Sequence, residues 1–330
     1  MAKRKWQDMK PQKVLVIGGL GFIGYHIVNE LKQQGFEVEI ASRKKKLKQI
    51  YKAPVVQVEL PAMSDEELLE VLSPYNSIIF AGGADDRSIP QGDVDEFFYN
   101  GNVRPCLRIA QLSHKLPINK MIILGSYFSH FARSRPDWKM IERHPYLKSR
   151  LQQLEKTIEA ASEKLHVSCL EIPYVFGSTP GLTPLWKPLV EYIAKSPIVF
   201  YTKGGTNMVA VEQVAQAIAG MLKTKQRRDH WLMVGDNLSW KQLIDLISSA
   251  AGKKKTVISL PNFVVRIAAL FTKFYFRLKG KNSGLDPYHF IETQTAETFL
   301  YDEESPLYLK YDKSDIAKSV GETVRACDVG

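Results

Sequence analysis

Cysteine is scarce in this sequence, and its arrangement builds no site. The 330 residues include three cysteines, Cys106, Cys169 and Cys327, which lie far apart, without C-x-x-C spacing and without a histidine cluster beside them. No metal site and no disulfide framework are therefore expected, and this cysteine usage fits a reducing compartment.

Long apolar runs are lacking as well. No stretch reaches the length of a membrane span, and residues 1–13 are polar and basic, without the apolar core of a secretory signal. Internal repeats and low-complexity blocks are also missing. With 45% hydrophobic and 24% charged residues, the composition is that of an ordinary globular protein. These features together predict a cytoplasmic protein.

Acidic residues are outnumbered by basic ones. The chain has 45 Lys and Arg against 35 Asp and Glu, a net charge of +10, with basic clusters at residues 2–5, 43–48 and 253–255. Such an excess indicates an anionic partner. A phosphorylated cofactor satisfies it as well as a nucleic acid or a membrane surface would. Because a phosphorylated cofactor is enough to account for the basic excess, we predict no nucleic-acid partner.

The chain is organised around residues 14–24. An apolar, β-branched run predicts a buried parallel strand, three glycines at three-residue spacing follow it, and residues 22–34 have a helical period. In a dinucleotide-binding unit, Gly18 allows the tight turn, Gly21 lets the backbone approach a pyrophosphate, and Gly24 lets the helix lie against the strand. The helix N-terminus offers its free N–H groups to the phosphates. A tight turn without a ligand is the alternative.

This G-x-x-G-x-x-G spacing resembles that of the short-chain dehydrogenase/reductase superfamily, most of all its extended branch, with Ile17 where Thr is often found. The resemblance implies an α/β fold: a doubly wound parallel-sheet Rossmann domain with a smaller, discontinuous C-terminal substrate lobe. The cofactor domain is expected at residues 1–173 and 198–236, and the lobe at 174–197 and 237–330. The turn residues implied to hold the cofactor are Gly18, Gly19, Leu20, Gly21, Phe22, Ile23 and Gly24.

Basic residues follow the second predicted strand, residues 37–41. An acid at this place binds the free 2′-hydroxyl of NAD, whereas an arginine accommodates a 2′-phosphate. Arg43, helped by Ser42 and Lys44, therefore predicts NADP(H) in preference to NAD(H). A basic, solvated helix start is the alternative.

The resemblance implies further cofactor residues at the ends of later strands. They are Glu59 and Leu60 beside the adenine, Ala81, Gly82 and Gly83 where the backbone approaches the cofactor, Asn102 as a structural asparagine behind the catalytic residues, and Pro173, Tyr174, Val175 and Phe176 along the nicotinamide carboxamide. Three positions depart from the family's usual residues. Glu59 stands for Asp, Glu171 for Arg, and Phe176 for Tyr.

A tyrosine at the start of a predicted helix carries the expected chemistry. In the family motif Tyr-x-x-x-Lys, the tyrosine exchanges a proton with the substrate oxygen, and the lysine binds the nicotinamide ribose and lowers the tyrosine pKa. Tyr146 matches this motif and Arg150 replaces its lysine; the i,i+4 spacing places both on one helix face. A guanidinium still favours phenolate but cannot relay a proton as an ammonium can. Two ordinary surface residues of a first helical turn are the alternative.

Hydroxyl groups beyond the fifth predicted strand, residues 120–124, are candidates for the family's catalytic Ser or Thr. The carboxyl ends of strands in such a sheet face the ligand crevice. Ser126 is nearest the strand end and is favoured. Alignment of the strand ends puts Tyr127 at the serine position instead, and Ser129 is the third candidate.

Residues 260–281 combine aromatic and aliphatic side chains at helical spacing with interleaved lysine and arginine. A helix of this kind usually buries its apolar face in the protein, and we expect it to pack inward in the substrate lobe. Weak contact with an anionic membrane surface, or with a lipid-like substrate, is the alternative.

These motifs predict an NADP(H)-dependent oxidoreductase that interconverts a carbonyl and an alcohol on a small or hydrophobic substrate, with Tyr146, Arg150 and Ser126 as catalytic residues. A nucleotide-sugar epimerase or dehydratase is the second interpretation. A catalytically silent NADP-binding sensor or scaffold is the third, which the altered Tyr-x-x-x-Arg motif favours. A homodimer remains open.

Overall fold

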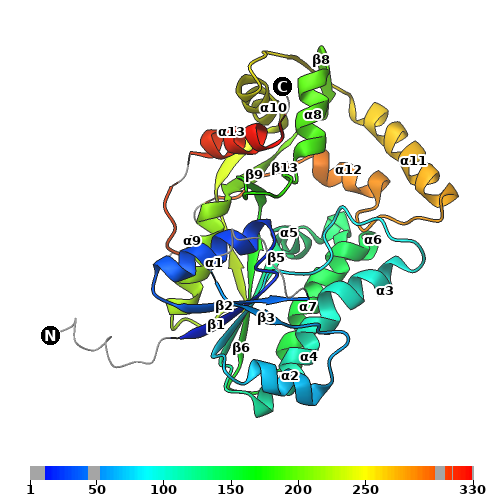
Figure 1. The fold of residues 1–330 in the computed structure, drawn as a ribbon. Coiled ribbons are helices and arrows are strands. Elements are labelled where there is room, and N and C mark those ends of the chain that lie inside the picture. The colour runs from blue at the N-terminus through cyan, green and yellow to red at the C-terminus, as the bar shows by residue number, and fades with distance from the viewer. Residues whose placement is uncertain (1–11, 44–52, 302–308, 314, 329–330) are drawn as a thin grey trace.

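A seven-stranded parallel sheet forms the centre of the larger lobe (Figure 1). The computed structural model describes residues 12–43, 53–301, 309–313 and 315–328. In spatial order the strands are β10 (His230–Leu232), β6 (His166–Ile172), β5 (Lys120–Ser126), β4 (Ser77–Phe80), β1 (Lys13–Ile17), β2 (Glu37–Ser42) and β3 (Val55–Gln57). The strand order reverses between β1 and β4, which is where such sheets leave a ligand crevice.

Helices cover both faces of this sheet (Figure 1). On one face, α1 (Phe22–Gln33) packs against α9 (Val211–Lys223); on the other lie α2 (Asp65–Leu72), α4 (Arg104–Leu112) and α7 (Pro145–Ala160). Successive residues of a strand point to opposite faces. Accordingly Val14 and Val16 join the first core, and Leu15 and Ile17 the second. The doubly wound α/β fold is confirmed.

The helical region over residues 94–115 consists of four pieces. These are α3 (Val94–Phe98), a π-helical turn η2 (Tyr99–Val103), α4, and a 3-10 turn η3 (Ser113–Lys115). The region begins at Asp93, whose carboxylate accepts hydrogen bonds from the first-turn N–H groups of residues 95 and 96. Pro105 has no N–H to continue the α-helical ladder, which accounts for the interruption before it. Asn102 lies in the wide turn.

The smaller lobe is assembled from separate parts of the chain (Figure 1). One sheet has the order β11 (Asp236–Ser239), β9 (Gly205–Ala210), β13 (Glu297–Thr298), and β7 (Tyr174–Phe176) also pairs with β9; β8 (Ile198–Tyr201) and β12 (Thr256–Ser259) form a separate parallel pair. Around them lie α8 (Lys187–Lys195), α10 (Trp240–Ala250), α12 (Pro287–Thr295) and α13 (Ile316–Ala326). Helices α8, α10 and α13 share one apolar core.

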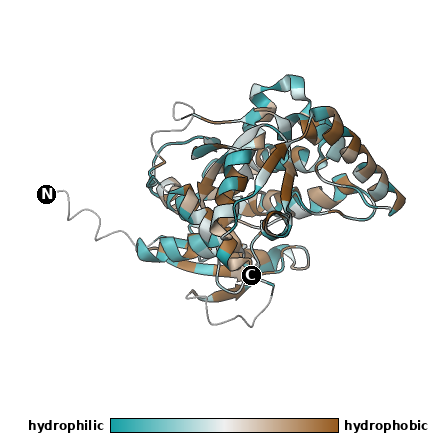
Figure 2. Ribbon diagram, turned by 90° about the horizontal axis from the view of Figure 1, so that it is seen from above, coloured by the Kyte–Doolittle hydropathy of each residue, from teal (hydrophilic) through white to brown (hydrophobic). Residues whose placement is uncertain are grey.

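Four short or peripheral elements complete the structure. They are α5 (Phe128–Ser134), the 3-10 turn η4 (Pro136–Trp138), α6 (Met140–Arg143) and α11 (Asn262–Leu278). The expectation that α11 packs its apolar face inward is wrong. Ala269 is its one buried residue, and its large aromatic and aliphatic side chains are exposed. Figure 2 shows hydrophobic, brown-coloured ribbon along the helices at the right-hand edge of the molecule, where this helix lies. Within the described ranges, no helix has both the length and the apolar character needed to cross a membrane.

Candidate active site

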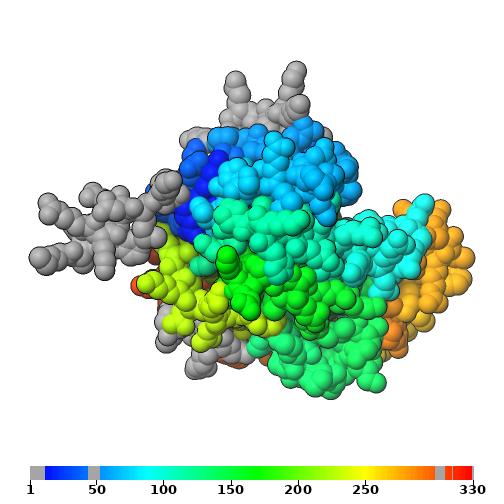
Figure 3. Space-filling model, turned by 90° about the horizontal axis from the view of Figure 1, so that it is seen from below, coloured from blue at the N-terminus to red at the C-terminus, as the bar shows by residue number. Residues whose placement is uncertain are grey.

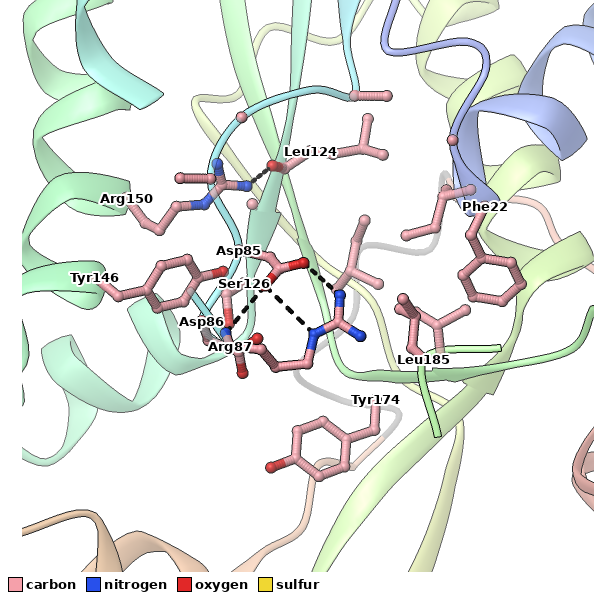
Figure 4. A pocket seen from close by; sticks show the side chains of 18 of the residues that line it. Phe22, Asp85, Asp86, Arg87, Leu124, Ser126, Tyr146, Arg150, Tyr174 and Leu185 are labelled. Atoms are coloured by element: carbon pink, nitrogen blue, oxygen red, sulfur yellow. Dashed lines mark hydrogen bonds and ion pairs between the residues drawn. The ribbon is translucent and has the colours of Figure 1, made fainter. Parts of the chain in front are cut away.

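A cavity of about 460 Å³ opens where the carboxyl ends of the central strands meet (Figure 4). Its wall comes from residues 21–24 of the glycine turn, residues 81–87 after β4, residues 124–128 at the end of β5, and residues 172–175 at the end of β6. Tyr146 and Arg150 of α7 complete this side, and Leu185 and Trp186 close the cavity from the smaller lobe. The cavity thus occupies the crevice that the strand order predicts.

Two glycines shape the turn that leads into α1. Gly18 has a φ of 86°, and a Cβ there would lie 2.6 Å from the backbone of Ala81. A Cβ on Gly24 would collide with the Gly18 carbonyl oxygen, so only glycine lets α1 start this close to the strand. Gly21 is the N-cap residue, and no side chain caps the N–H groups of the first turn. These N–H groups are therefore available to an anionic ligand.

The predicted cofactor residues of the turn fall into two groups. Gly21, Phe22, Ile23 and Gly24 lie in the cavity wall, whereas Gly18, Gly19 and Leu20 form the bend before them and do not line the cavity. After β4, Ala81, Gly82 and Gly83 all belong to the wall.

The predicted ribose and adenine residues lie away from the cavity wall. Ser42, the last residue of β2, is buried and Arg43 is exposed, while Lys44 lies outside the described residues. Glu59 is exposed and Leu60 is buried in the second core. Ser42, Arg43, Glu59 and Leu60 lie at the end of the sheet where β2 and β3 terminate, apart from the catalytic candidates.

Asn102 connects two parts of the site. Its side chain is fully buried; Oδ1 accepts a hydrogen bond from the Ala84 N–H at 2.9 Å, and Nδ2 donates to Ser149 Oγ at 3.0 Å. Ser149 in turn donates to the carbonyl oxygen of Tyr146 at 2.7 Å. The asparagine therefore holds the loop after β4 against the first turns of α7.

Tyr146 presents its hydroxyl to the cavity (Figure 4). Within the described part of the chain this hydroxyl has no hydrogen-bond partner, and the ring packs edge-on against Phe98 with centroids 5.6 Å apart. Burial raises the pKa of Tyr146 to about 12, a rise that the positive charge of Arg150 opposes and that Asp86 and Asp85 reinforce. The phenol is therefore protonated at neutral pH.

Arg150 is held from two sides. It donates from Nη2 to the carbonyl oxygen of Leu124 at the end of β5, and from Nη1 to Gln153 Oε1 at 2.8 Å. Its guanidinium carbon lies 5.9 Å from the centre of the Tyr146 ring. The Nε–H group is buried and has no partner among the described residues. A planar cation thus stands beside the tyrosine in a fixed orientation, with its buried Nε–H unpaired.

The three candidates for the serine role separate clearly. Ser126 is the last residue of β5 and lines the cavity; its Oγ accepts a hydrogen bond from the Phe128 N–H at 3.3 Å. Tyr127 also contributes to the wall, but its hydroxyl bonds Thr206 and Thr298 in the smaller lobe. Ser129 is buried within α5 and does not line the cavity. The geometry favours Ser126.

Three charged residues that sequence reasoning missed line the cavity. They are Asp85, Asp86 and Arg87, in the loop after β4 (Figure 4). Asp85 and Arg87 form an ion pair with each other. Asp86 is partly buried, and burial together with the neighbouring Asp85 raises the pKa of its carboxyl. Their position directly after the Ala-Gly-Gly-Ala run at a strand end was the signal that could have identified them.

The segment after β6 divides between the cavity and the core. Pro173, Tyr174 and Val175 line the cavity, whereas Phe176 is fully buried and stacks on Trp186 with ring centroids 4.7 Å apart. The side chain of Phe176 therefore packs in the core and does not face the cavity.

The buried carboxylate of Glu171, before this segment, pairs with two partners. Arg133 of α5 lies 2.7 Å from it and His230 of β10 lies 3.0 Å away. The negative charge of Glu171, at a position where the family usually has arginine, is therefore paired with the Arg133 guanidinium.

The residues of this crevice fit a nicotinamide cofactor. The uncapped N–H groups of α1 and the unpaired Nε–H of Arg150 are the donors that a phosphorylated ligand along this edge of the sheet would use. Among the described residues, no cluster of His, Cys, Asp and Glu is suited to a metal ion.

Fold and site together define an NAD(P)-dependent enzyme with a Rossmann domain and a second lobe. The chain belongs to the NAD dependent epimerase/dehydratase family, whose model matches residues 14–234. Among curated proteins no sequence matches this chain.

Solved structures of low sequence identity share the fold over nearly the whole chain. The crystal structure of gox2253 has 17% identity and a TM-score of 0.75 and covers 96% of this chain and 97% of its own. UDP-N-acetylglucosamine 4-epimerase from Bacillus cereus has 14% identity and a TM-score of 0.68, with coverage of 95% and 96%. UDP-glucuronic acid 4-epimerase from Bacillus cereus, in complex with UDP-glucuronic acid and NAD, has 12% identity and a TM-score of 0.65, with coverage of 96% and 99%.

Proposed function

We propose that this protein is an NADP(H)-dependent oxidoreductase that interconverts a carbonyl and an alcohol on a small or hydrophobic substrate. The observation that carries the proposal is the hydroxyl of Tyr146. It faces a cavity walled by the glycine turn, and a fixed arginine stands 5.9 Å from its ring. When bound, NADP(H) supplies hydride chemistry, and the protein supplies placement and electrostatics.

In this proposal Tyr146 is the acid/base group. With a pKa of about 12 it holds its proton at neutral pH and can donate that proton from Oη to a carbonyl oxygen. Ser126 Oγ, at the end of β5, hydrogen-bonds the same substrate oxygen. The guanidinium of Arg150 stabilises the charge that develops on the phenol and orients the cofactor ribose.

The lining of the cavity supports a small or hydrophobic substrate. The smaller lobe contributes Val175, Leu185 and Trp186, which are apolar, and Tyr174, which adds an aromatic ring with one hydroxyl. Among the described residues the wall contains two cations, Arg150 and Arg87, and the second is already paired with Asp85. A nucleotide diphosphate would need free cationic or N–H donors on the substrate side.

The preference for NADP(H) is the second part of the proposal, and it rests on Arg43. This arginine follows directly after β2 and is exposed, so its guanidinium is free to reach a 2′-phosphate. A charge-assisted hydrogen bond of this kind contributes about 1.5–3 kcal/mol, which corresponds to roughly 10- to 100-fold in affinity.

Turnover tests the proposed reaction. The protein is mixed with NADPH and a panel of aliphatic and aromatic aldehydes, and NADPH oxidation is recorded. Tyr146→Phe is expected to lower the rate by about 100-fold or more while NADPH still binds. Unchanged turnover in Tyr146→Phe would remove the tyrosine from its assigned role.

Fluorescence titration with NADPH and NADH tests the cofactor preference. Wild-type protein is expected to bind NADPH more tightly, and Arg43→Ala to lose roughly 10- to 100-fold in NADPH affinity with NADH binding unchanged. Arg104→Ala, at an exposed arginine on α4, is the matched control and should bind both as the wild type does. Equal losses for both cofactors in Arg43→Ala would contradict the proposal.

A nucleotide-sugar epimerase or dehydratase is the second candidate, favoured by the family and by structural neighbours whose names state that activity. Such an enzyme recycles its hydride, so nicotinamide should remain bound through purification and no net NADPH oxidation should accompany turnover. Conversion of UDP-sugars without added cofactor would establish this function in place of the first.

A catalytically silent NADP-binding protein is the third candidate, because Arg150 replaces the motif lysine. Arg150→Lys separates this function from the first two. Higher turnover in the variant indicates an enzyme weakened by the arginine. Cofactor binding without turnover in either form indicates a sensor or scaffold.

A further inference from the structure

Helix α11 turns its apolar side away from the protein. Six large side chains, 53–71% exposed, repeat at three- and four-residue spacing and form one stripe along the helix. They are Phe263, Ile267, Leu270, Phe271, Phe274 and Leu278. In a helix that only completes a globular core, a stripe of this width is the buried side.

The orientation of α11 is held by its cations. Arg266 pairs with Glu292 of α12 at 3.4 Å, and Lys273 pairs with Asp286, the N-cap residue of α12, at 2.5 Å. Ala269 lies buried between them in sequence. Because these ion pairs bind the polar side of α11 to α12, they hold the apolar stripe on the outward side of the helix.

The charge of the protein is concentrated around this helix. Residues 246–285 contain eight Lys and Arg and no Asp or Glu, against a net charge of +10 for the whole chain. Within this segment Arg277 and Lys279 are exposed next to the apolar stripe, and Lys279 lies 5.9 Å from the ring of Tyr275. The stripe is therefore bordered by cations that no acid of the same segment neutralises.

An exposed apolar pair of strands precedes α11 in the chain. Ile198 and Phe200 of β8 and Ile258 of β12 are 41–48% exposed, and Phe200 is in register with Ile258. Leu260, two residues after Ile258, donates its N–H to the carbonyl oxygen of Tyr201 in β8. Figure 3 shows α11, in orange, at the rim of the molecule beside α3.

We propose that α11 lies flat on an anionic lipid surface, with its apolar stripe in the acyl boundary and its bordering cations at the phosphate headgroups. Aromatic and aliphatic residues on one side with lysine and arginine beside them are the features of an interfacial helix. Anionic headgroups complement the charge of residues 246–285, and each cation near such a surface contributes to binding.

A second copy of this chain fits the same face poorly. A two-fold interface places the same patch on both subunits. Arg277 and Lys279, which border the stripe, would then face their own copies, and residues 246–285 contain no acid to pair with them. Charge complementarity therefore favours lipid over self-association.

Vesicle co-sedimentation of the full chain tests this inference, which does not depend on the proposed reaction. The wild type is expected to bind vesicles of equal parts phosphatidylcholine and phosphatidylglycerol, to bind pure phosphatidylcholine more weakly, and to be released by salt. The double variant Phe271→Ser/Phe274→Ser should bind on the order of 100-fold more weakly. Arg277→Glu/Lys279→Glu should lose at least about tenfold.

The matched control is Lys225→Glu/Arg227→Glu, a double charge reversal at exposed residues of the loop between α9 and β10. It should bind as the wild type does, and all variants should keep the wild-type thermal midpoint. The inference is overturned if the wild type does not bind the anionic vesicles, or if the control loses as much binding as the α11 variants. It is also overturned if light scattering shows a dimer that Phe271→Ser/Phe274→Ser dissociates without any vesicle binding by the wild type.

Discussion

Protonation of His144 is expected to destabilise the start of α7, the helix that carries Tyr146. His144 is the residue before α7 and is 1% exposed. Its Nδ1 accepts a hydrogen bond from the Asp286 N–H at 3.0 Å, and this contact attaches α12 to the turn that carries Tyr146. A protonated ring has no acceptor at Nδ1, so acid must break the contact.

The magnitude follows from the pKa. Burial lowers the pKa of His144 from 6.5 to about 4, an effect that the charge of Asp286 partly opposes. Because the unfolded chain binds this proton more readily than the folded one, the stabilisation is complete above pH 6.5 and is lost as the pH falls toward 4. Between pH 7.5 and pH 5 the loss in unfolding free energy is about 2 kcal/mol.

Urea denaturation at these two pH values measures the effect. In His144→Asn the amide oxygen can still accept from Asp286 but does not titrate, so the pH-dependent loss should be about 2 kcal/mol smaller than in the wild type. His114→Asn, at an exposed histidine of the 3-10 turn after α4, is the control and should follow the wild type. Equal pH dependence in His144→Asn and wild type would refute the argument.

Three further predictions concern the site. Gly24→Ala should abolish NADPH binding in a fluorescence titration because its Cβ has no space, whereas Gly321→Ala in α13, which meets only the end of a flexible arginine, should bind normally. Asn102→Ala should lower the unfolding free energy by about 1–3 kcal/mol in urea, since it leaves buried partners without hydrogen bonds. Arg150→Met should reduce turnover about 100-fold more than Arg150→Lys, which keeps a positive charge beside the phenol. A cation 5.9 Å from the phenol ring stabilises the ionised state by about 3 kcal/mol at an effective dielectric constant of about 20. Similar rates in both variants would contradict this.

Local signals in the sequence were sufficient for the larger lobe. Side chains of residues 14–17 alternate between the two cores, so every position of this run is apolar. This is the pattern of a parallel strand with helices on both faces of its sheet. Ser64 and Glu67, at the spacing typical of a capping box, form one at the start of α2, with both reciprocal hydrogen bonds present. Each of these features depends on neighbours within a few residues.

The site was less accessible to sequence reasoning because its members meet only through the fold. Tyr127 could replace Ser126 on spacing alone, and only the fold shows that its hydroxyl bonds Thr206 and Thr298 in the smaller lobe. Asp86 has no motif, and its place in the cavity wall depends on the path of the loop after β4. Periodicity revealed the apolar stripe of α11, but the direction in which a stripe points depends on what the rest of the chain places beside it.

The departures from the family pattern support a working site more than a decaying one. Here Arg150 is fixed by Leu124 and Gln153, and Glu171 is matched by Arg133 and His230. These two residues, which replace the family's usual ones, are therefore held by hydrogen bonds and ion pairs near a cavity to which the phenol of Tyr146 is exposed. We infer that the arginine is an alternative way to hold charge beside Tyr146, and turnover of Arg150→Lys below the wild-type rate is the result expected from a site adapted to the guanidinium.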